Sequence, residues 1–152
     1  AANLGQCGPN HGVHLNHRLR NMKRIEHIGI AVRDLKSAER IFEDILGEPA
    51  FKRESVPSES VNVSFFQTGE SKVELLASTS PDGPIAKYIE KRGEGLHHLA
   101  FAVDDLNSEI ERLQEMGYRV VSGPKEGADQ KMIAFLHPAD SSKVLVELCA
   151  PR

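Results

Sequence analysis

The sequence predicts an α+β protein built from two tandem βαβββ modules. The segment from Ile25 to Leu35 is repeated 71 residues later as the segment from Leu96 to Leu106. Each copy alternates large apolar side chains with small or polar ones, which is the period of a strand with one packed face. Each copy is followed by helical apolar spacing and then by three short apolar stretches. Such an internal repeat is typical of a duplicated fold.

The opening strand of each module has two different faces. One face carries a histidine and small residues in both copies: His27, Gly29 and Ala31, then His98, Ala100 and Ala102. The other face carries large apolar residues in both copies: Ile28, Ile30 and Val32, then Leu99, Phe101 and Val103. Since successive strand side chains point to opposite faces, one face packs and the other leaves room for a ligand.

A helix is expected after each opening strand. The spacing of apolar residues predicts helices over residues 35–46 and about 107–116. An acid that can cap the helix precedes each one, and a glycine ends each one. The acids are Asp34 and Asp105, and the glycines are Gly47 and Gly117.

Three short strands are expected to complete each module. Alternation and turn residues predict strands near 50–54, 61–67 and 72–77, and near 119–122, 132–137 and 144–149. A short helix, with proline in its first turn and Gly93 beyond its end, is predicted over residues 84–92. The chain therefore divides into a polar N-terminal extension (1–22), a first module (23–79), a linker helix (80–95) and a second module (96–152).

Composition excludes several classes of protein. Of the 152 residues 39% are hydrophobic and 27% charged, which is ordinary for a soluble globular domain. A net charge of −3 gives no general attraction to nucleic acid or to a membrane surface. No apolar run approaches the ~18 residues of a membrane-spanning helix. Two cysteines, Cys7 and Cys149, make no disulfide framework, so a reducing cytoplasm is expected.

The extension carries His11, His14 and His17 at three-residue spacing. On a helix these side chains could hold a metal ion. Because glycines and a proline in the same stretch oppose a helix, we expect a polar tail instead.

The duplication includes a glutamate on the last strand of each half. Val73-Glu74-Leu75-Leu76 matches Val146-Glu147-Leu148-Cys149. A buried, unpaired carboxylate costs several kcal/mol or else takes up a proton. Two of them at equivalent positions, each matched by a histidine, predict one shared divalent cation. The predicted ligands are His27, Glu74, His98 and Glu147, a set that suits zinc, cobalt, nickel, manganese or iron.

Other polar residues receive smaller roles. His97 has the opposite strand parity to His98 and is expected on the packing or edge face, with no part in metal binding. His137, beside Pro138, is expected to orient a loop or to touch the substrate. Asn62 and Gln67 are considered as polar groups of the pocket.

The repeat and its His-Glu-His-Glu set resemble the vicinal oxygen chelate superfamily, which includes glyoxalase I. Within it, three stretches resemble the methylmalonyl-CoA epimerase family. They are Ile25–Val32, Ser80–His98 (SPDGPIAKYIEKRGEGLHH), and Ala134–Pro138 followed by Val144–Leu148. The resemblance covers about residues 23–150.

This resemblance implies a mixed-sheet open barrel around one divalent metal ion per chain. It implies an acyl-CoA substrate and a homodimer. The implied reaction interconverts (2R)- and (2S)-methylmalonyl-CoA by removing and returning the C2 proton through a metal-stabilised enolate. Glu147 is the first candidate for the base that moves this proton, and Glu74 is the second.

The chain departs from the family pattern at two places. Many members carry a Gly-Ala-x-Gly-x-Lys loop, whereas this chain reads Gly127-Ala128-Asp129-Gln130-Lys131. Some members have a glutamate, proposed as a second base, in the strand that here contains Asn62 and Ser64, so that role is not carried over. Lys87, Lys91, Arg92 and Lys131 could meet the phosphates of coenzyme A, although a solvated surface role is favoured for each.

Two other functions fit the same fold. A glyoxalase I-like lactoylglutathione lyase uses the same four ligand types, and the epimerase-like stretches argue against it. A metal-free, small-molecule-binding protein of the resistance type is the second alternative, and the complete set of four ligands argues against it.

Overall fold

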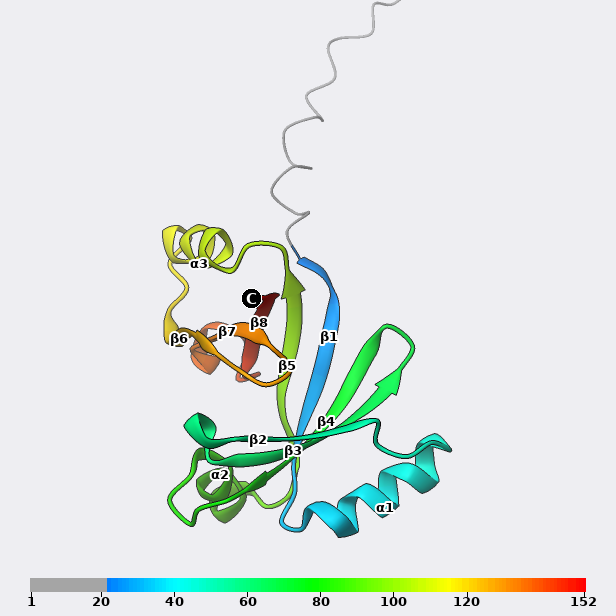
Figure 1. Cartoon of the computed structure of the whole chain (residues 1–152). Helices are drawn as coiled ribbons and strands as arrows, with labels where there is room; N and C mark the ends of the chain where they lie inside the picture. The colour runs from blue at the N-terminus through cyan, green and yellow to red at the C-terminus, as the bar shows by residue number, and fades with distance from the viewer. Residues whose placement is uncertain (1–21) are drawn as a thin grey trace, which may run out of the picture.

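The computed structural model describes residues 22–152. Over these residues eight strands form one curled sheet in the order β2-β3-β4-β1-β5-β8-β7-β6 (Figure 1). The strands are β1 (Met22–Ala31), β2 (Lys52–Val56), β3 (Val61–Thr68), β4 (Ser71–Ser78), β5 (Gly95–Val103), β6 (Val120–Glu126), β7 (Lys131–Leu136) and β8 (Val146–Pro151). The helices are α1 (Leu35–Leu46), α2 (Pro84–Arg92) and α3 (Leu106–Glu115), with 3₁₀ turns η1 (Pro57–Glu59) and η2 (Pro138–Asp140). None of these helices is long and apolar enough to cross a membrane.

The sheet repeats the duplication of the sequence. Strand β1 pairs in parallel with β4, and its counterpart β5 pairs in parallel with β8. The two modules join where β1 and β5 run antiparallel, and the remaining pairs are antiparallel. The predicted α+β fold of two βαβββ modules in a mixed, open-barrel sheet is therefore confirmed.

The packing faces of the opening strands lie under the helices. Ile30 of β1 and Val32, just after it, pack with Ala38 of α1, and Val103 of β5 packs with Leu106 and Ile110 around α3. Figure 1 shows both helices on the outer side of the curled sheet. The histidine faces of β1 and β5 consequently turn toward the inside of the barrel, as the alternation predicts.

The caps explain why the helices begin where they do. The Asp34 carboxylate accepts a hydrogen bond from the Ser37 backbone N–H at 3.2 Å, and Asp105 accepts one from Ser108 at 3.1 Å. Gly47 ends α1 in the left-handed conformation, with φ 76°. The prediction for α1 is confirmed, and α3 begins one residue earlier than predicted.

Several strand bounds differ from the prediction. Strand β6 continues to Glu126, because Lys125 and Glu126 still pair with β7 after two register shifts. Strand β8 begins at Val146 rather than at residue 144, since the Val144 backbone N–H closes a turn onto Ser141. Strand β2 spans Lys52–Val56, two residues later than expected.

The register between β1 and β5 contains a bulge at Glu26. Ile25 pairs with Phe101 and His27 pairs with Ala100, so Glu26 has no residue opposite it. Further along, Gly29 lies opposite His98. A Cβ atom built on Gly29 would overlap the His98 ring. The small residue predicted on the roomy face is therefore required to be glycine, because the imidazole lies directly over its Cα.

We expect Gly29→Ala to destabilise the protein by about 1–3 kcal/mol, because the new methyl group must push the His98 ring aside. Denaturant unfolding of the metal-free protein measures this loss. In a His98→Ala background the methyl group meets no ring, and most of the loss should disappear. The matched control is Ala100→Gly, at the equivalent position of the second module, with an expected cost of about 1 kcal/mol. Equal losses from Gly29→Ala in both backgrounds would contradict the proposed clash.

Candidate metal centre

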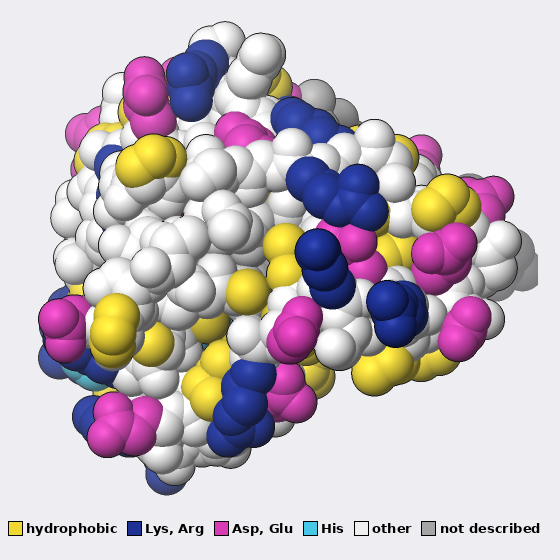
Figure 2. All heavy atoms as spheres, turned by 60° about the horizontal axis from the view of Figure 1, so that its bottom comes forward, with side chains coloured by type: hydrophobic (Ala, Val, Ile, Leu, Met, Phe, Trp, Pro, Cys, Tyr) yellow, Lys and Arg dark blue, Asp and Glu magenta, His cyan; other side chains and the backbone are white. Residues whose placement is uncertain are grey.

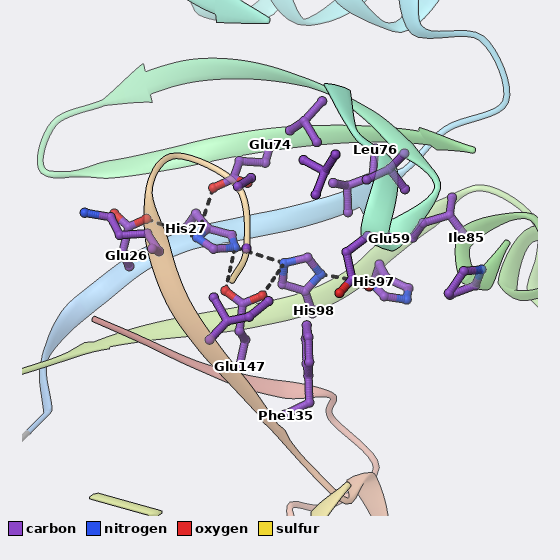
Figure 3. Close-up of a pocket in the computed structure, with 18 residues that line it drawn as sticks. Glu26, His27, Glu59, Glu74, Leu76, Ile85, His97, His98, Phe135 and Glu147 are labelled. Atoms are coloured by element: carbon purple, nitrogen blue, oxygen red, sulfur yellow. Dashed lines mark hydrogen bonds and ion pairs between the residues drawn. The ribbon is translucent and has the colours of Figure 1, made fainter. Parts of the chain in front are cut away.

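The four predicted ligands project from the four central strands into the barrel. His27 lies on β1, Glu74 on β4, His98 on β5 and Glu147 on β8. Their exposed fractions are 5%, 4%, 9% and 4%. Figure 3 shows His27 between the two carboxylates, with His98 beside Glu147. His27 and Glu147, which are 120 residues apart along the chain, thus meet in a buried cluster, because the duplicated strands lie side by side.

Three of these side chains face one another directly. The Nε2 atoms of His27 and His98 are 2.9 Å apart. Glu147 Oε2 lies 3.1 Å from His27 Nε2, and Glu147 Oε1 lies 3.8 Å from His98 Nε2. One potential ligand atom from each residue falls within 4.8 Å of the other two. Two imidazoles and a carboxylate therefore converge from both modules.

Glu74 contacts the same cluster from the other side of the His27 ring. Its Oε2 atom lies 3.0 Å from His27 Nδ1, and Glu26 Oε1 lies 3.2 Å from the same nitrogen. The structure thus brings all four predicted residues together. His27, His98 and Glu147 converge on one point, whereas Glu74 faces His27 Nδ1 instead. Orienting a histidine through its second nitrogen is a common role for a carboxylate beside a metal site.

The hydrogen-bonding roles of the rings fit a cation. Because His27 Nδ1 faces two carboxylates, it carries the proton, and the lone pair of a neutral ring is then on Nε2. That lone pair points toward His98 Nε2. Oε2 of Glu147 is buried and accepts no satisfactory hydrogen bond. An orphaned carboxylate oxygen and two facing imidazole nitrogens are donors that suit a divalent metal ion.

The surroundings of the two histidines shift their pKa values in opposite directions. Burial opposes a charge on His27, but contacts with Cys149 and with the carboxylates of Glu147, Glu26 and Glu74 outweigh burial and raise its pKa well above the usual value. Burial, together with the charge on His27, lowers the pKa of His98 well below its usual value. Burial also raises the pKa of Glu147. A proton on His27 supplies the charge that a metal ion would replace.

A second group of potential ligands shares His27. Atoms of Glu26, His27 and Cys149 also lie within 4.8 Å of one another. Burial raises the pKa of the Cys149 thiol, which keeps the sulfur protonated near neutral pH. The nitrogen and oxygen donors of His27, His98 and Glu147 are therefore the better metal site.

His97 contacts the centre more closely than strand parity predicts. Its Nδ1 atom lies 2.9 Å from His98 Nδ1, and its ring packs edge-on to Tyr88 with centroids 4.8 Å apart. Burial lowers the pKa of His97 to about 4, so the ring is neutral and can accept a hydrogen bond. Parity fixes the direction of Cβ, but a ring can still turn back toward its neighbour. His97 is thus no ligand of the convergent group, yet it holds the His98 ring.

A buried charge network supports the centre, and sequence analysis missed it. The Lys72 ammonium, 6% exposed, lies 2.8 Å from Glu26 Oε1 and 2.5 Å from Asp129 Oδ2. Asp129 also pairs with Lys52 at 2.9 Å. Hydrogen bonds with His27 and Lys72 outweigh the effect of burial and lower the pKa of Glu26 to about 2. Lys72 and Glu74 are two residues apart on β4, so their side chains point to the same face of the strand. This spacing was the sequence signal that could have placed Lys72 beside the centre.

A cavity of about 90 Å³ opens beside the ligands. Its walls are mostly apolar and include Val63, Leu76, Ile85 and Phe135, while Glu59 and Lys131 add charge. On the face shown in Figure 2, apolar side chains gather in the hollowed middle and charged side chains surround it. The arrangement offers a small apolar site next to the cluster of candidate metal ligands.

The remaining predicted residues have mixed outcomes. His137 orients a loop as predicted, because its Nδ1 accepts a hydrogen bond from the Ala139 backbone N–H at 3.0 Å. The pocket roles of Asn62 and Gln67 are wrong, since both are exposed and neither lines the cavity. Gln67 instead donates to the backbone of its own turn. The histidines at positions 11, 14 and 17 lie outside the described residues.

Comparison with known proteins agrees with this geometry. Residues 26–135 match the family model of the Glyoxalase/Bleomycin resistance protein/Dioxygenase superfamily. The mitochondrial methylmalonyl-CoA epimerase of Homo sapiens is 38% identical over 84% of this chain and 74% of its own length. The ethylmalonyl-CoA/methylmalonyl-CoA epimerase of Cereibacter sphaeroides is 38% identical over 82% and 96%. A variant of the Streptomyces coelicolor methylmalonyl-CoA epimerase, in complex with 2-nitronate-propionyl-CoA, has a TM-score of 0.80 and 32% identity over 86% and 95%.

The chain belongs to the Glyoxalase/Bleomycin resistance protein/Dioxygenase superfamily, whose model matches most of its length. Within this superfamily it is a member of the methylmalonyl-CoA epimerase family, a family of isomerases.

Replacing His97 should weaken metal binding without removing a ligand. We expect His97→Phe to lower zinc affinity about 10- to 100-fold, because His98 Nδ1 loses its acceptor while the ring packing on Tyr88 is kept. The matched variant is His97→Asn, whose Oδ1 can replace the imidazole Nδ1 as acceptor, with a smaller expected loss. Competition with a chromophoric chelator measures both affinities. Wild-type affinity in His97→Phe would contradict the orienting role.

The charge network predicts different costs for its two lysines. Lys72→Met leaves the buried Glu26 carboxylate without its ammonium partner and should cost about 3 kcal/mol. Lys52→Met removes a partner whose side chain is 36% exposed and should cost at most about 1 kcal/mol. Denaturant unfolding of the metal-free protein at neutral pH compares the two variants. Similar losses would show that burial of Lys72 does not set its contribution.

Proposed function

We propose that the protein is a metal-dependent epimerase that interconverts (2R)- and (2S)-methylmalonyl-CoA by moving the C2 proton. One observation carries the proposal: His27, His98 and Glu147 converge beside an apolar cavity in a chain of the epimerase family. The reaction needs a proton carrier and a means of stabilising an enolate. Both requirements can be met in this cavity.

We assign metal binding to His27, His98 and Glu147, with Glu74 as the fourth ligand. When bound, a divalent cation such as zinc, cobalt, nickel or manganese supplies positive charge that stabilises the negative charge developing on the substrate. The chain's own residues prepare the site, because Glu26 holds the His27 ring and His97 holds the His98 ring. This support keeps both Nε2 lone pairs directed inward.

The proton of C2 requires a carboxylate beside it. Glu147 is buried, and its Oε2 has no satisfied hydrogen bond. Glu147 lies on the side where the two histidines converge, 3.1 Å from His27 Nε2 and 3.8 Å from His98 Nε2, whereas Glu74 Oε2 lies at His27 Nδ1, on the other side of that ring. The apolar walls around the carboxylate limit access of water to the enolate. Glu147 is thus the first candidate for the base, and Glu74 remains the second.

An acyl-CoA substrate fits the composition of the site. The apolar walls suit a short acyl group, and Lys131 lines the cavity, where a cation could contact a polar part of the substrate. Lys87 and Lys91 are exposed on α2, and contact with the phosphates stays a prediction for them. The homodimer and the cytoplasmic location implied by the family also stay predictions.

The decisive experiment follows a single epimer of methylmalonyl-CoA in D₂O with metal-loaded protein. We expect inversion and incorporation of deuterium at C2. Removing a ligand by His98→Ala should lower kcat/KM by about 10³-fold, about 4 kcal/mol in the barrier. The matched control is His137→Ala, which removes a loop-capping histidine away from the cavity and should leave kcat/KM nearly unchanged.

Three other results would overturn the proposal. Wild-type protein that neither exchanges nor inverts C2 with any of these metals is not this epimerase. Turnover of methylglyoxal with glutathione, without epimerisation, would favour the lyase alternative. A metal content that stays near zero at low-micromolar free metal would favour a metal-free binding protein.

A further inference from the structure

A turn of the second module reaches across the open side of the barrel. Strands β2 and β6 stand at the two ends of the sheet. The turn between β6 and β7, residues 127–130, contacts β2. There the Asp129 backbone N–H donates a hydrogen bond to Glu54 Oε2 at 2.8 Å, and Asp129 Oδ1 lies 2.9 Å from the Lys52 ammonium. A turn of the second module is thereby attached to an edge strand of the first.

The conformation of this turn depends on the contacts that hold it. Asp129 and Gln130 have φ angles of 56° and 55°, in the left-handed region that side chains disfavour. Ala128 packs against a buried cluster of the first module that includes Leu76. Gly127 and Ala128 also line the cavity, and Figure 3 shows the turn in pale orange. The turn is therefore a wall of the cavity that is docked onto the first module.

Asp129 is connected to the metal centre through two further charged residues. Its Oδ2 atom pairs with the Lys72 ammonium, and that ammonium lies 2.8 Å from Glu26 Oε1. The same Glu26 oxygen lies 3.2 Å from His27 Nδ1. Lys72 and Glu26 are only 6% and 4% exposed, so little water is available to replace these contacts. Four residues therefore form one connected path from the turn to the His27 ring.

The charge of Lys72 is shared between two carboxylates. Burial opposes a charge on this ammonium, but its contacts with Asp129 and Glu26 outweigh burial and raise its pKa. Without the Asp129 carboxylate, Glu26 would have to satisfy the buried ammonium alone. Its oxygen would then be drawn away from His27 Nδ1. Glu74 contacts the same nitrogen independently of the turn, so the ring would still be held in part.

We propose that Asp129 is a positioning residue for His27: from the second module it holds Lys72, which keeps the Glu26 carboxylate at His27 Nδ1. The effect on metal binding rests on the proposed function, which assigns the metal ion to this histidine. Asp129 itself does not line the cavity, so it acts on the ring through its neighbours. Since the same turn forms a wall of the cavity, its docking both closes the cavity and orients a ligand.

The first test measures zinc affinity by competition with a chromophoric chelator. Asp129→Asn should lower the affinity about 10-fold, because Glu26 no longer orients the His27 ring fully. Asp129→Glu, which keeps a carboxylate, should recover most of the affinity. The matched control is Asp140→Asn, which breaks an ion pair with Arg119 outside the cavity and should leave the affinity unchanged. Wild-type affinity in Asp129→Asn, or an equal loss in Asp140→Asn, would overturn the assignment.

A double-mutant cycle tests the path through Lys72. Lys72→Met removes the link, so adding Asp129→Asn to it should change zinc affinity by less than about 2-fold. Lys52→Met removes only the more exposed partner of Asp129, so adding Asp129→Asn to it should still lower the affinity about 10-fold. Equal losses from Asp129→Asn in the wild-type and Lys72→Met backgrounds would overturn the path. If Lys72→Met does not fold, Asp129→Glu decides, and a loss equal to that of Asp129→Asn would overturn the assignment.

The metal-free protein provides a measurement that depends neither on metal nor on turnover. The His27 Nδ1 proton faces Glu26 and Glu74 in a buried site, and NMR can follow its exchange with water. Asp129→Asn should speed this exchange several-fold, and Asp140→Asn should not. Unchanged exchange in Asp129→Asn would overturn the positioning role. Wild-type protein that binds no metal, or that binds metal without epimerising its substrate, would contradict the proposed function, and the exchange measurement would still decide the role of Asp129.

Discussion

The structure depends on a close approach of groups that repel one another without a cation. His27 and His98 direct Nε2 atoms at each other from 2.9 Å, and the Glu147 carboxylate stands beside them with an unsatisfied oxygen. Lone pairs and negative charge at this distance are unfavourable in a buried site. A proton on His27 relieves the conflict in part, and a divalent metal ion relieves it for all three groups. The contacts of Glu26 and Glu74 with His27, and of His97 with His98, hold the two rings in place despite this repulsion.

The duplicated fold supplies equivalent positions, but the two halves are not identical at the site. His27 is oriented by carboxylates, whereas His98 is oriented by the neutral ring of His97. Gly29 must be glycine opposite His98, while Ala100 is accommodated opposite His27. The bulge at Glu26 creates part of this difference, because it brings an additional carboxylate into the first half. Asymmetry of this kind allows two related glutamates, Glu74 and Glu147, to take different roles.

Much of the fold followed from short-range patterns. Alternation, helical spacing and capping acids predicted the elements, because one buried face and one cap are local requirements. The clustering of His27, Glu74, His98 and Glu147 followed from the repeat, since equivalent strands in a duplicated sheet bring equivalent side chains together. The bulge at Glu26, the reach of the His97 ring and the pairing of Lys72 with Asp129 could not be predicted, because they depend on register and on long-range contacts. Asn62 and Gln67 were misassigned because polarity alone does not say which side of a strand faces the cavity.

The antiparallel junction of β1 and β5 has a thermodynamic consequence. His27 and His98 are 71 residues apart and belong to different modules, so an ion shared between them would act as a cross-link across the junction. Such a cross-link closes a long loop and favours the folded chain over the unfolded one by the free energy of binding. Metal supply in the cell would then determine how long the folded chain survives, as well as how fast it works.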